Sequence, residues 1–395
     1  MSQREVVVLS GVRTAIADFG GALKDQPATE LAAKVVAEAV SRSGLAPGDI
    51  GHCVIGSVLH GDRRDMYIGR VAALKGGLPA ETPALTVNRL CGSGLQALVS
   101  AAQMILLDDC DAAVAGGAES MSRAPYWLPT ARFGSKMGDV AMVDPMVGVL
   151  TCPMGDVHMG VTAENISEQF SISREQQDQL ALLSHQRGQR AIEEKRFVEQ
   201  ILPIEIKTRK GVKVFDQDEH VRFDCDIESM AKLRPAFKKD GSVTAGNASG
   251  LNDGAAAVVL MERRAAEAKG LKPMAKMLGY ATAGVEPSIM GTGPIPAVRK
   301  LLTKTGVNVE DIDIWEANEA FAAQALAVSN ELGLDPQKVN PNGSGIGLGH
   351  PIGATGAIMS IKALYELQRT GGRYAVATMC IGGGQGIAVL FERCE

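Results

Sequence analysis

Cys91 is the residue whose position most suggests chemistry. It stands between an apolar, strand-like run, "ALTVNRL", and an apolar helical segment opened by Gly92, Ser93 and Gly94. A cysteine at a helix N-terminus faces free backbone N–H groups and the positive end of the helix dipole, which stabilise a thiolate. A cysteine in apolar surroundings is more often an inert core residue. Cys91 is therefore a candidate nucleophile that needs a partner.

His350 and Cys380 are the candidate partners. His350 lies in the glycine-dense segment "GSGIGLGHPIGATGA", before a second apolar helix, and Cys380 ends a buried strand in "ATMCIGGGQG". A lone histidine is usually structural, but a base that accepts a thiol proton is what a cysteine nucleophile requires. A second thiol at the same point could exchange protons with a substrate. We therefore predict a nucleophile, its base and a second acid/base group.

An internal repeat brings these residues together. Residues 31–56 and 293–318 both read as a helix, a glycine cap, a short turn and a strand, and Gly306 stands 262 residues after Gly44 (306 − 44). The segment from Asn88 falls on the segment from His350 at the same offset (350 − 88), with Gly94 on Gly356. Each of these two segments opens a long apolar helix, and each helix is followed by a short apolar strand that ends in glycines. The sequence therefore predicts a duplicated chain.

The repeat is interrupted between about residues 121 and 250. This stretch holds a charged helical segment, a lysine-rich strand segment and Gly/Asn turns, and it reads as an insertion. The two halves are predicted to be rich in βαβ units and to pack face to face. The carboxyl ends of their strands and the N-termini of their helices then converge where α/β folds bind ligands. We expect the site at this convergence.

Composition narrows the classes of function. The chain has 395 residues, of which 46% are hydrophobic and 22% charged, as in packed globular proteins. A net charge of −5 makes nucleic acids and anionic membranes poor partners. The sequence shows no secretory leader and no apolar run of about eighteen residues, so we expect a cytoplasmic protein. Seven cysteines without a CxxC spacing argue against a disulfide framework and a metal site.

Six segments, in chain order, resemble the signature segments of the thiolase family: "VNRLCGSGLQA", "AGGAESMSRAPY", "GNASGLNDGAA", "EANEAFAAQ", "GSGIGLGHPIGATGA" and "TMCIGGGQG". The resemblance implies a five-layered αβαβα fold. Its N-terminal half would comprise residues 1–120 and 251–272, its inserted loop domain residues 121–250, and its C-terminal half residues 273–395. The insertion carries "VHMGVTAEN", which is most similar to bacterial short-chain β-ketothiolases and acetyl-CoA acetyltransferases, especially broad-range ones that also accept propionyl-CoA.

The resemblance also implies roles for individual residues. Cys91 would be acylated, His350 would deprotonate it, and Cys380 would be the second acid/base group. Asn318 would hold a water that binds the enolate oxygen together with His350, while the backbone N–H groups of Cys91 and Gly382 would bind the acyl-enzyme oxygen. Contacts to coenzyme A and the acyl group would come from His158, Met159, Arg222, Phe237, Ala245, Gly246, Ser249, Met290 and Phe321.

The implied reaction is a reversible, ping-pong Claisen condensation of acetyl-CoA with acetyl-CoA or propionyl-CoA, through acyl-Cys91. The partners would be acyl-CoA, 3-ketoacyl-CoA and CoA, which are substrates, so no cofactor is expected, and the assembly would be a homotetramer built from dimers. Met159 and Met290 are predicted to narrow the acyl site. Gly347 departs from the Ser or Ala common in relatives, which predicts a less rigid loop.

Four alternatives compete with this interpretation. A degradative 3-ketoacyl-CoA thiolase of fatty-acid oxidation shares the motifs and would favour long chains. A decarboxylating ketosynthase shares the duplicated fold but usually has two histidines, so Cys380 argues against it. A dinucleotide-binding dehydrogenase is disfavoured because "GSGIGLGH" lacks the GxGxxG spacing. A non-catalytic scaffold would be expected to have lost one of Cys91, His350 or Cys380.

Overall fold

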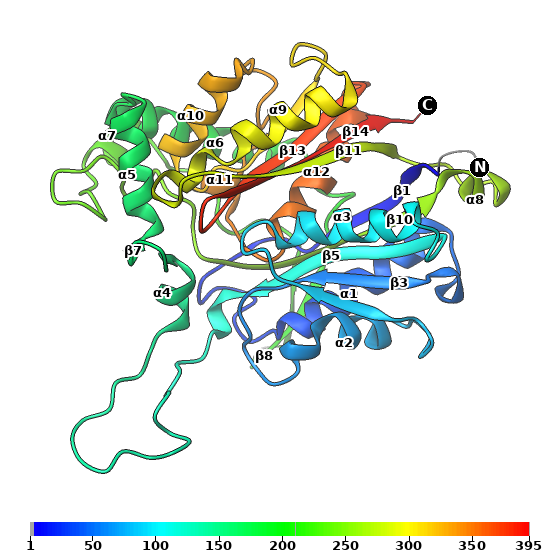
Figure 1. Ribbon diagram of the computed structural model, residues 1–395, viewed down its shortest axis with the longest axis horizontal. Coiled ribbons are helices and arrows are strands. Elements are labelled where there is room, and N and C mark those ends of the chain that lie inside the picture. Colours follow the sequence, from blue (N-terminus) through cyan, green and yellow to red (C-terminus); the bar gives the residue numbers. More distant parts are fainter. Residues whose placement is uncertain (1–3, 210, 395) are drawn as a thin grey trace.

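The computed structural model describes residues 4–209 and 211–394. The predicted halves also include residues 1–3 and 395, which lie outside the described residues. One large mixed sheet runs through the molecule (Figure 1). Its strands are, in spatial order, β4 (Ala84–Val87), β3 (His52–Gly56), β5 (Ala112–Ser120), β10 (Asn252–Glu262), β1 (Val6–Arg13), β11 (Ala275–Gly284), β14 (Gln385–Arg393), β13 (Tyr374–Ile381) and β12 (Ile314–Ala317), with β2 (Ala17–Asp18) beside β10.

This sheet consists of two similar halves joined at one narrow point. β1 and β11 pair only through Val7 with Lys276 and Val8 with Ala275. Within the first half, β3 pairs in parallel with both β4 and β5, and β10 runs antiparallel to β5 and β1. In the second half, β12 is parallel to β13, and β14 is antiparallel to β13 and β11. Both halves are therefore mixed sheets with the same order of strand directions, to which the first half adds β4 as a further parallel strand at its edge.

Helices complete five layers. The helices are α1 (Ala28–Ser43), α2 (Ile68–Lys75), α3 (Ser93–Leu106), α4 (Pro145–Val149), α5 (Met159–Gln169), α6 (Arg174–Glu193), α7 (Ile227–Ala231), α8 (Arg263–Ala268), α9 (Pro294–Thr305), α10 (Ala322–Leu332), α11 (Gly345–Leu348) and α12 (Thr355–Thr370). In Figure 1, α1 and α2 cover one outer face, α9 and α10 cover the other, and α3 and α12 lie between the two half-sheets. Most residues of α3 and α12 are buried, as a middle layer requires. The predicted αβαβα arrangement is confirmed.

The internal duplication is also confirmed. α1 and α9 both end at a glycine in the left-handed conformation, Gly44 (φ 76°) and Gly306 (φ 71°), where a side chain would be strained. α3 and α12 begin at Ser93 and Thr355, again 262 residues apart (355 − 93). The repeat seen in the sequence is thus a repeat of whole helix and strand units.

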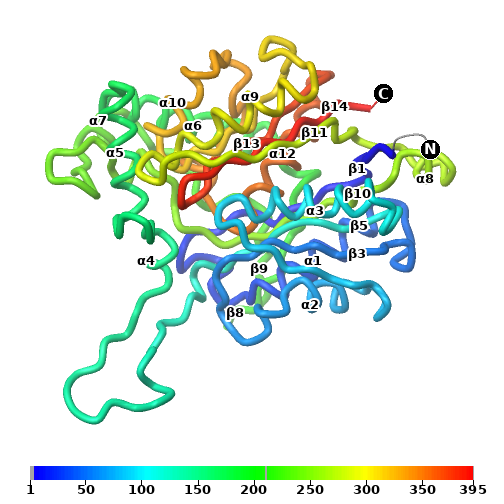
Figure 2. The backbone as a smooth tube through the Cα atoms, in the orientation of Figure 1, coloured from blue at the N-terminus to red at the C-terminus, as the bar shows by residue number. Residues whose placement is uncertain are grey.

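Most of the inserted segment packs on the C-terminal half. α5 contacts α10, and α6 contacts α10, α11 and α7, while the hairpins β6–β7 (Thr151–Cys152, Val157–His158) and β8–β9 (Ile204–Thr208, Gly211–Phe215) form two separate two-stranded sheets. The chain between about residues 125 and 144 extends away from the body of the molecule (Figure 2). Within the part of the chain that the structure describes, no helix is long and apolar enough to cross a bilayer.

Candidate active site

Two glycines bring the beginnings of α3 and α12 into contact. A Cβ atom on Gly94 would lie 2.9 Å from Ala357 N, and a Cβ atom on Gly356 would lie 2.4 Å from Leu95 N. Such contacts are too short for any side chain, so the helices approach this closely only because both residues are glycine. The loops that precede the two helices carry Cys91 and His350. The same symmetry that repeats the sequence therefore juxtaposes these two side chains.

Cys91 lies in a tight turn between β4 and α3. Leu90 has φ 47°, and the hydroxyl of Ser93 donates to Leu90 O (2.6 Å) and accepts from Arg89 N (2.9 Å), which fixes the turn. Burial raises the pKa of the Cys91 thiol to about 11, while the backbone N–H groups of Gly382 and of Cys91 itself lower it. The local N–H groups favour the thiolate, as expected at a helix start, but burial outweighs them and the net shift of the pKa is upward. Cys91 rests as a thiol and needs a base.

His350 is built to be that base. Thr355 donates its hydroxyl proton to Pro351 O (2.9 Å), so its oxygen accepts from Nδ1 of His350 (2.7 Å). Nδ1 consequently carries the ring proton, and Nε2 holds a free lone pair. Burial lowers the pKa of His350 to about 4, which keeps the ring neutral near pH 7. The backbone N–H of His350 donates to Oδ1 of Asn252 (2.8 Å), which fixes the loop.

Cys380 is buried at the end of β13, with 1% of its surface exposed. Burial, and then the nearby Cys91, raise the pKa of its thiol. Cys91 and Cys380 line the same cavity. Two residues further on, Gly382 presents its N–H to the sulfur of Cys91. A Cβ atom on Gly382 would lie 2.9 Å from Cε of Met159, so the glycine also leaves room for that side chain.

Asn318 lies next to His350 but is not among the residues that line the cavity. Its Nδ2 atom is 3.5 Å from Nε2 of His350, and its Oδ1 atom is buried without a hydrogen-bond partner among the described residues. Its backbone N–H donates to Thr378 O, which ties this loop to β13 (3.0 Å). An unpartnered buried amide oxygen is unusual and fits a site that holds a water.

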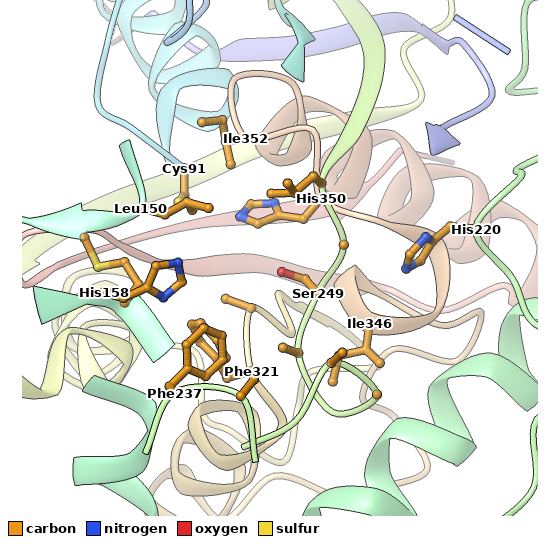
Figure 3. Close-up of a pocket in the computed structure, with 18 of the residues that line it drawn as sticks. Cys91, Leu150, His158, His220, Phe237, Ser249, Phe321, Ile346, His350 and Ile352 are labelled. Atoms are coloured by element: carbon orange, nitrogen blue, oxygen red, sulfur yellow. The ribbon is translucent and has the colours of Figure 1, made fainter. Parts of the chain in front are cut away.

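The predicted residues surround one cavity of about 670 Å³ (Figure 3). All of the predicted site residues except Asn318 line it. His158 stacks on Phe237 with ring centroids 4.7 Å apart, and Phe321 meets Phe237 edge to face at 6.1 Å. The residues of the lining that the sequence did not suggest include Leu150, His185, His220, Asp224, Cys225, Met230, Leu233 and Ile352. Sequence reasoning could not find these residues, because they share no motif or spacing and come together only in the folded cavity.

Glu119 is a further buried group that the sequence did not reveal. Its carboxylate accepts hydrogen bonds from the backbone N–H groups of Val58 (3.1 Å), Leu59 (3.0 Å) and Gly353 (2.9 Å). Burial raises the pKa of Glu119 to about 8, and the three N–H donors oppose that shift. Because Gly353 follows His350 closely, Glu119 joins the histidine loop to the N-terminal half.

A second network holds the loops from the side of the insertion. Ser184 on α6 donates to Oε2 of Glu319 (2.6 Å) and accepts from the N–H groups of Ser344 (3.2 Å) and Gly347 (3.0 Å). A Cβ atom on Gly347 would lie 2.6 Å from Ser184 O. The expectation that Gly347 loosens this loop is not supported, because the glycine permits a close contact with α6. Through Ser184, the insertion therefore holds both the loop that contains Glu319 and the loop that contains Ser344 and Gly347.

Comparison with known proteins accounts for this arrangement. Family models for the N-terminal and C-terminal thiolase domains match residues 6–264 and 271–393. The chain belongs to the thiolase family. It is 62% identical to the beta-ketothiolase BktB of Cupriavidus necator over 99% of both chains. It superposes on the acetyl-CoA acetyltransferase of Bacillus anthracis with a TM-score of 0.97 and 48% identity over 100% of both chains. The human mitochondrial 3-ketoacyl-CoA thiolase in complex with CoA gives a TM-score of 0.96 and 43% identity over 99% of this chain and 98% of that one.

Proposed function

We propose that this thiolase is a β-ketothiolase of the acetyl-CoA acetyltransferase type, which condenses acetyl-CoA with acetyl-CoA or propionyl-CoA and also runs the reverse thiolysis. The observation that carries this proposal is a single cavity in which Cys91, His350 and Cys380 meet, with two backbone N–H groups at the sulfur of Cys91. This set contains a nucleophile, its base, a second acid/base group and donors for an oxyanion.

In the first half-reaction, the sulfur of Cys91 attacks the thioester carbonyl of acetyl-CoA and gives its proton to Nε2 of His350. The oxyanion accepts hydrogen bonds from the N–H groups of Cys91 and Gly382. When the carbon–sulfur bond to CoA breaks, the leaving sulfur takes the proton of Cys380. CoA thus departs as a thiol, and an imidazolium and a thiolate remain.

In the second half-reaction, the Cys380 thiolate removes an α-proton from the incoming acetyl-CoA. Burial raises the pKa of this thiol, which makes its thiolate a strong base. The enolate oxygen is stabilised by Nε2–H of protonated His350 and by a water on Asn318. The α-carbon then attacks acetyl-Cys91, and the Cys91 sulfur leaves and recovers its proton from His350. Every proton is returned, and no cofactor is required.

Substrate contacts follow from the cavity wall. We propose that Arg222, Ala245, Gly246 and Ser249 contact the nucleotide and pantetheine of CoA, and that Phe237 packs on the pantetheine. Met159 and Met290 are 5% and 4% exposed and lie beside Cys380 in one apolar cluster. They would limit the acyl group to a short chain, because each further methylene must displace packed side chains.

We propose association through residues 125–144. Phe133 and Met137 are 93% and 94% exposed, and Trp127 is 55% exposed. Apolar side chains gathered on an extended loop mark a surface for another protein chain.

We also propose that the assembly is a homotetramer built from dimers and that the protein is cytoplasmic. The proposed division of the chain is into two halves and an inserted domain at residues 121–250. Light scattering of the intact protein measures the mass of the assembly.

Assays in both directions test the function. CoA release from acetyl-CoA, with and without propionyl-CoA, should accompany formation of 3-ketoacyl-CoA, and CoA should cleave 3-ketobutyryl-CoA. Thiolysis rates that increase from 3-ketobutyryl-CoA towards 3-ketopalmitoyl-CoA would instead assign the protein to the degradative branch of the family. Release of carbon dioxide from a malonyl thioester would indicate a ketosynthase.

A further inference from the structure

Asn340 stands beside the strand that leads to Asn318. Trp315 in β12 donates its backbone N–H to Lys338 O (2.9 Å), and Asn340 donates its own to Trp315 O (2.7 Å), so the chain before Asn340 pairs with β12 as a short parallel strand would. The backbone of Asn340 is left-handed (φ 46°), a conformation that asparagine tolerates better than most residues. The main chain therefore turns away from β12 before it can pair with Ala317.

The side chain of Asn340 continues the pairing that its main chain ends. In a parallel ladder Ala317 N would bond to the backbone carbonyl of Asn340, but that carbonyl accepts from Gly343 N (3.0 Å) in a turn. Instead, Oδ1 of Asn340 accepts from Ala317 N (2.9 Å), and Nδ2 donates to Ala317 O (2.8 Å). Nδ2 also donates to Oε1 of Glu319 (2.8 Å). Asn340 thus binds the residue before Asn318 and the residue after it.

Asn318 depends on these neighbours for its orientation. Among the described residues its amide oxygen has no hydrogen-bond partner, and its Nδ2 has only the 3.5 Å contact with Nε2 of His350. A Cβ atom on Gly345 would lie 2.8 Å from Oδ1 of Asn318, so the amide is packed against that glycine. A side chain without strong bonds of its own takes its direction from its backbone, and the backbone on either side is held by Asn340.

We propose that Asn340 is a positioning residue for Asn318, and through it for the water that binds the enolate oxygen. The inference rests on the proposed function, because Asn318 acts in its second half-reaction. Asn340 is buried and is not among the described residues that line the cavity, so it acts without touching the substrate. Acylation of Cys91 does not use Asn318. A change at Asn340 should therefore slow carbon–carbon bond formation and spare acylation.

The variant Asn340→Gly tests this role, because glycine adopts a positive φ without strain and only the amide is removed. Single-turnover release of CoA from acetyl-CoA should change less than about twofold, whereas isolated acetyl-enzyme should form 3-ketobutyryl-CoA at least about tenfold more slowly, since the oxyanion water is misplaced. The loss should not exceed the roughly hundredfold to thousandfold that removal of one oxyanion donor costs. Asn308→Gly, at an exposed position outside the cavity, is the control and should leave both steps unchanged.

A double-mutant cycle separates positioning from a general structural effect. Asn318→Ala removes the side chain that holds the water, so adding Asn340→Gly should slow the second step by less than about a further twofold. A residue that only stabilises the fold would give additive losses instead. Asn340→Ser keeps one donor and one acceptor on a shorter side chain. It should lose less than the glycine variant, and it completes the same cycle if that variant does not fold.

Three results would overturn the inference: a folded Asn340→Gly protein that condenses at the wild-type rate, equal declines of both steps, or additive losses in the double variant. A wild type that acetyl-CoA does not acylate would instead contradict the proposed function. A crystal structure of Asn340→Gly decides the positioning role even then. The amide of Asn318 should be displaced in it, and an amide at the wild-type position would refute the inference.

Discussion

Gly356→Ala should show that the contact between α3 and α12 sets the geometry of the reaction. The added Cβ would lie 2.4 Å from Leu95 N, and ordinary van der Waals contact begins at 3.4 Å, so about 1 Å of separation is required (3.4 − 2.4). Both atoms belong to rigid helices, so the helices themselves must move. Overpacking of this kind costs about 1–3 kcal/mol of stability, and a displacement of about 1 Å at a catalytic pair costs about a hundredfold in rate.

The assay for this variant is single-turnover release of CoA from acetyl-CoA, measured together with thermal unfolding. We expect acylation of Cys91 to slow about a hundredfold in a protein that is still folded. Gly94→Ala, whose nearest contact is 2.9 Å, should have a smaller effect, and Gly48→Ala, which has no atom within 4 Å, is the matched control. If Gly356→Ala acylates at the wild-type rate while it is measurably destabilised, the helix contact does not position Cys91 against His350.

Three further predictions concern the chemistry and the acyl site. Cys380→Ser should still transfer the acetyl group to Cys91, because CoA can depart as a thiolate without the proton of Cys380, while condensation falls by several orders of magnitude, because a hydroxyl is a far weaker base than a thiolate; equal declines of both steps would contradict the role of Cys380 as the base that removes the α-proton. Met290→Ala should raise kcat/KM for thiolysis of 3-ketohexanoyl-CoA relative to 3-ketobutyryl-CoA by about tenfold or more, and an unchanged ratio removes Met290 from the acyl wall. Burial lowers the pKa of His350 to about 4, so its neutral form persists as the pH falls and is lost only near pH 4. Acylation should therefore be as fast at pH 6 as at pH 8, whereas a decline of about fourfold between them would show a histidine titrating with its ordinary pKa of about 6.5.

The duplicated fold was predictable because each repeat carries its own local signals. A helix that ends in a left-handed glycine is visible in the sequence at Gly44 and again at Gly306, and the common offset then aligns Cys91 with the loop of His350. The five layers themselves came from the resemblance to thiolases. Local sequence patterns predicted the helix and strand units of each half, and the resemblance to thiolases predicted how these units stack in layers.

The parts that the sequence did not reveal are long-range and polar. Glu119 reaches Gly353 across 234 residues, and Ser184 reaches Gly347 across 163 residues. No periodicity marks such pairs, because a buried polar side chain is defined by the partner that satisfies it. The net rise in the pKa of Cys91 could not be predicted for a related reason: the helix start is a local feature, whereas burial, which raises the pKa, depends on the whole fold.

The most direct test of the account is the identity of the acylated residue. The protein is incubated briefly with isotopically labelled acetyl-CoA, quenched in acid and digested, and the peptides are analysed by mass spectrometry. We predict one acetyl group per chain as a thioester on Cys91, no label in Cys91→Ala, and label retained in Cys380→Ser. Label on Cys380 or on another residue, or turnover by Cys91→Ala at the wild-type rate, would contradict the central claim.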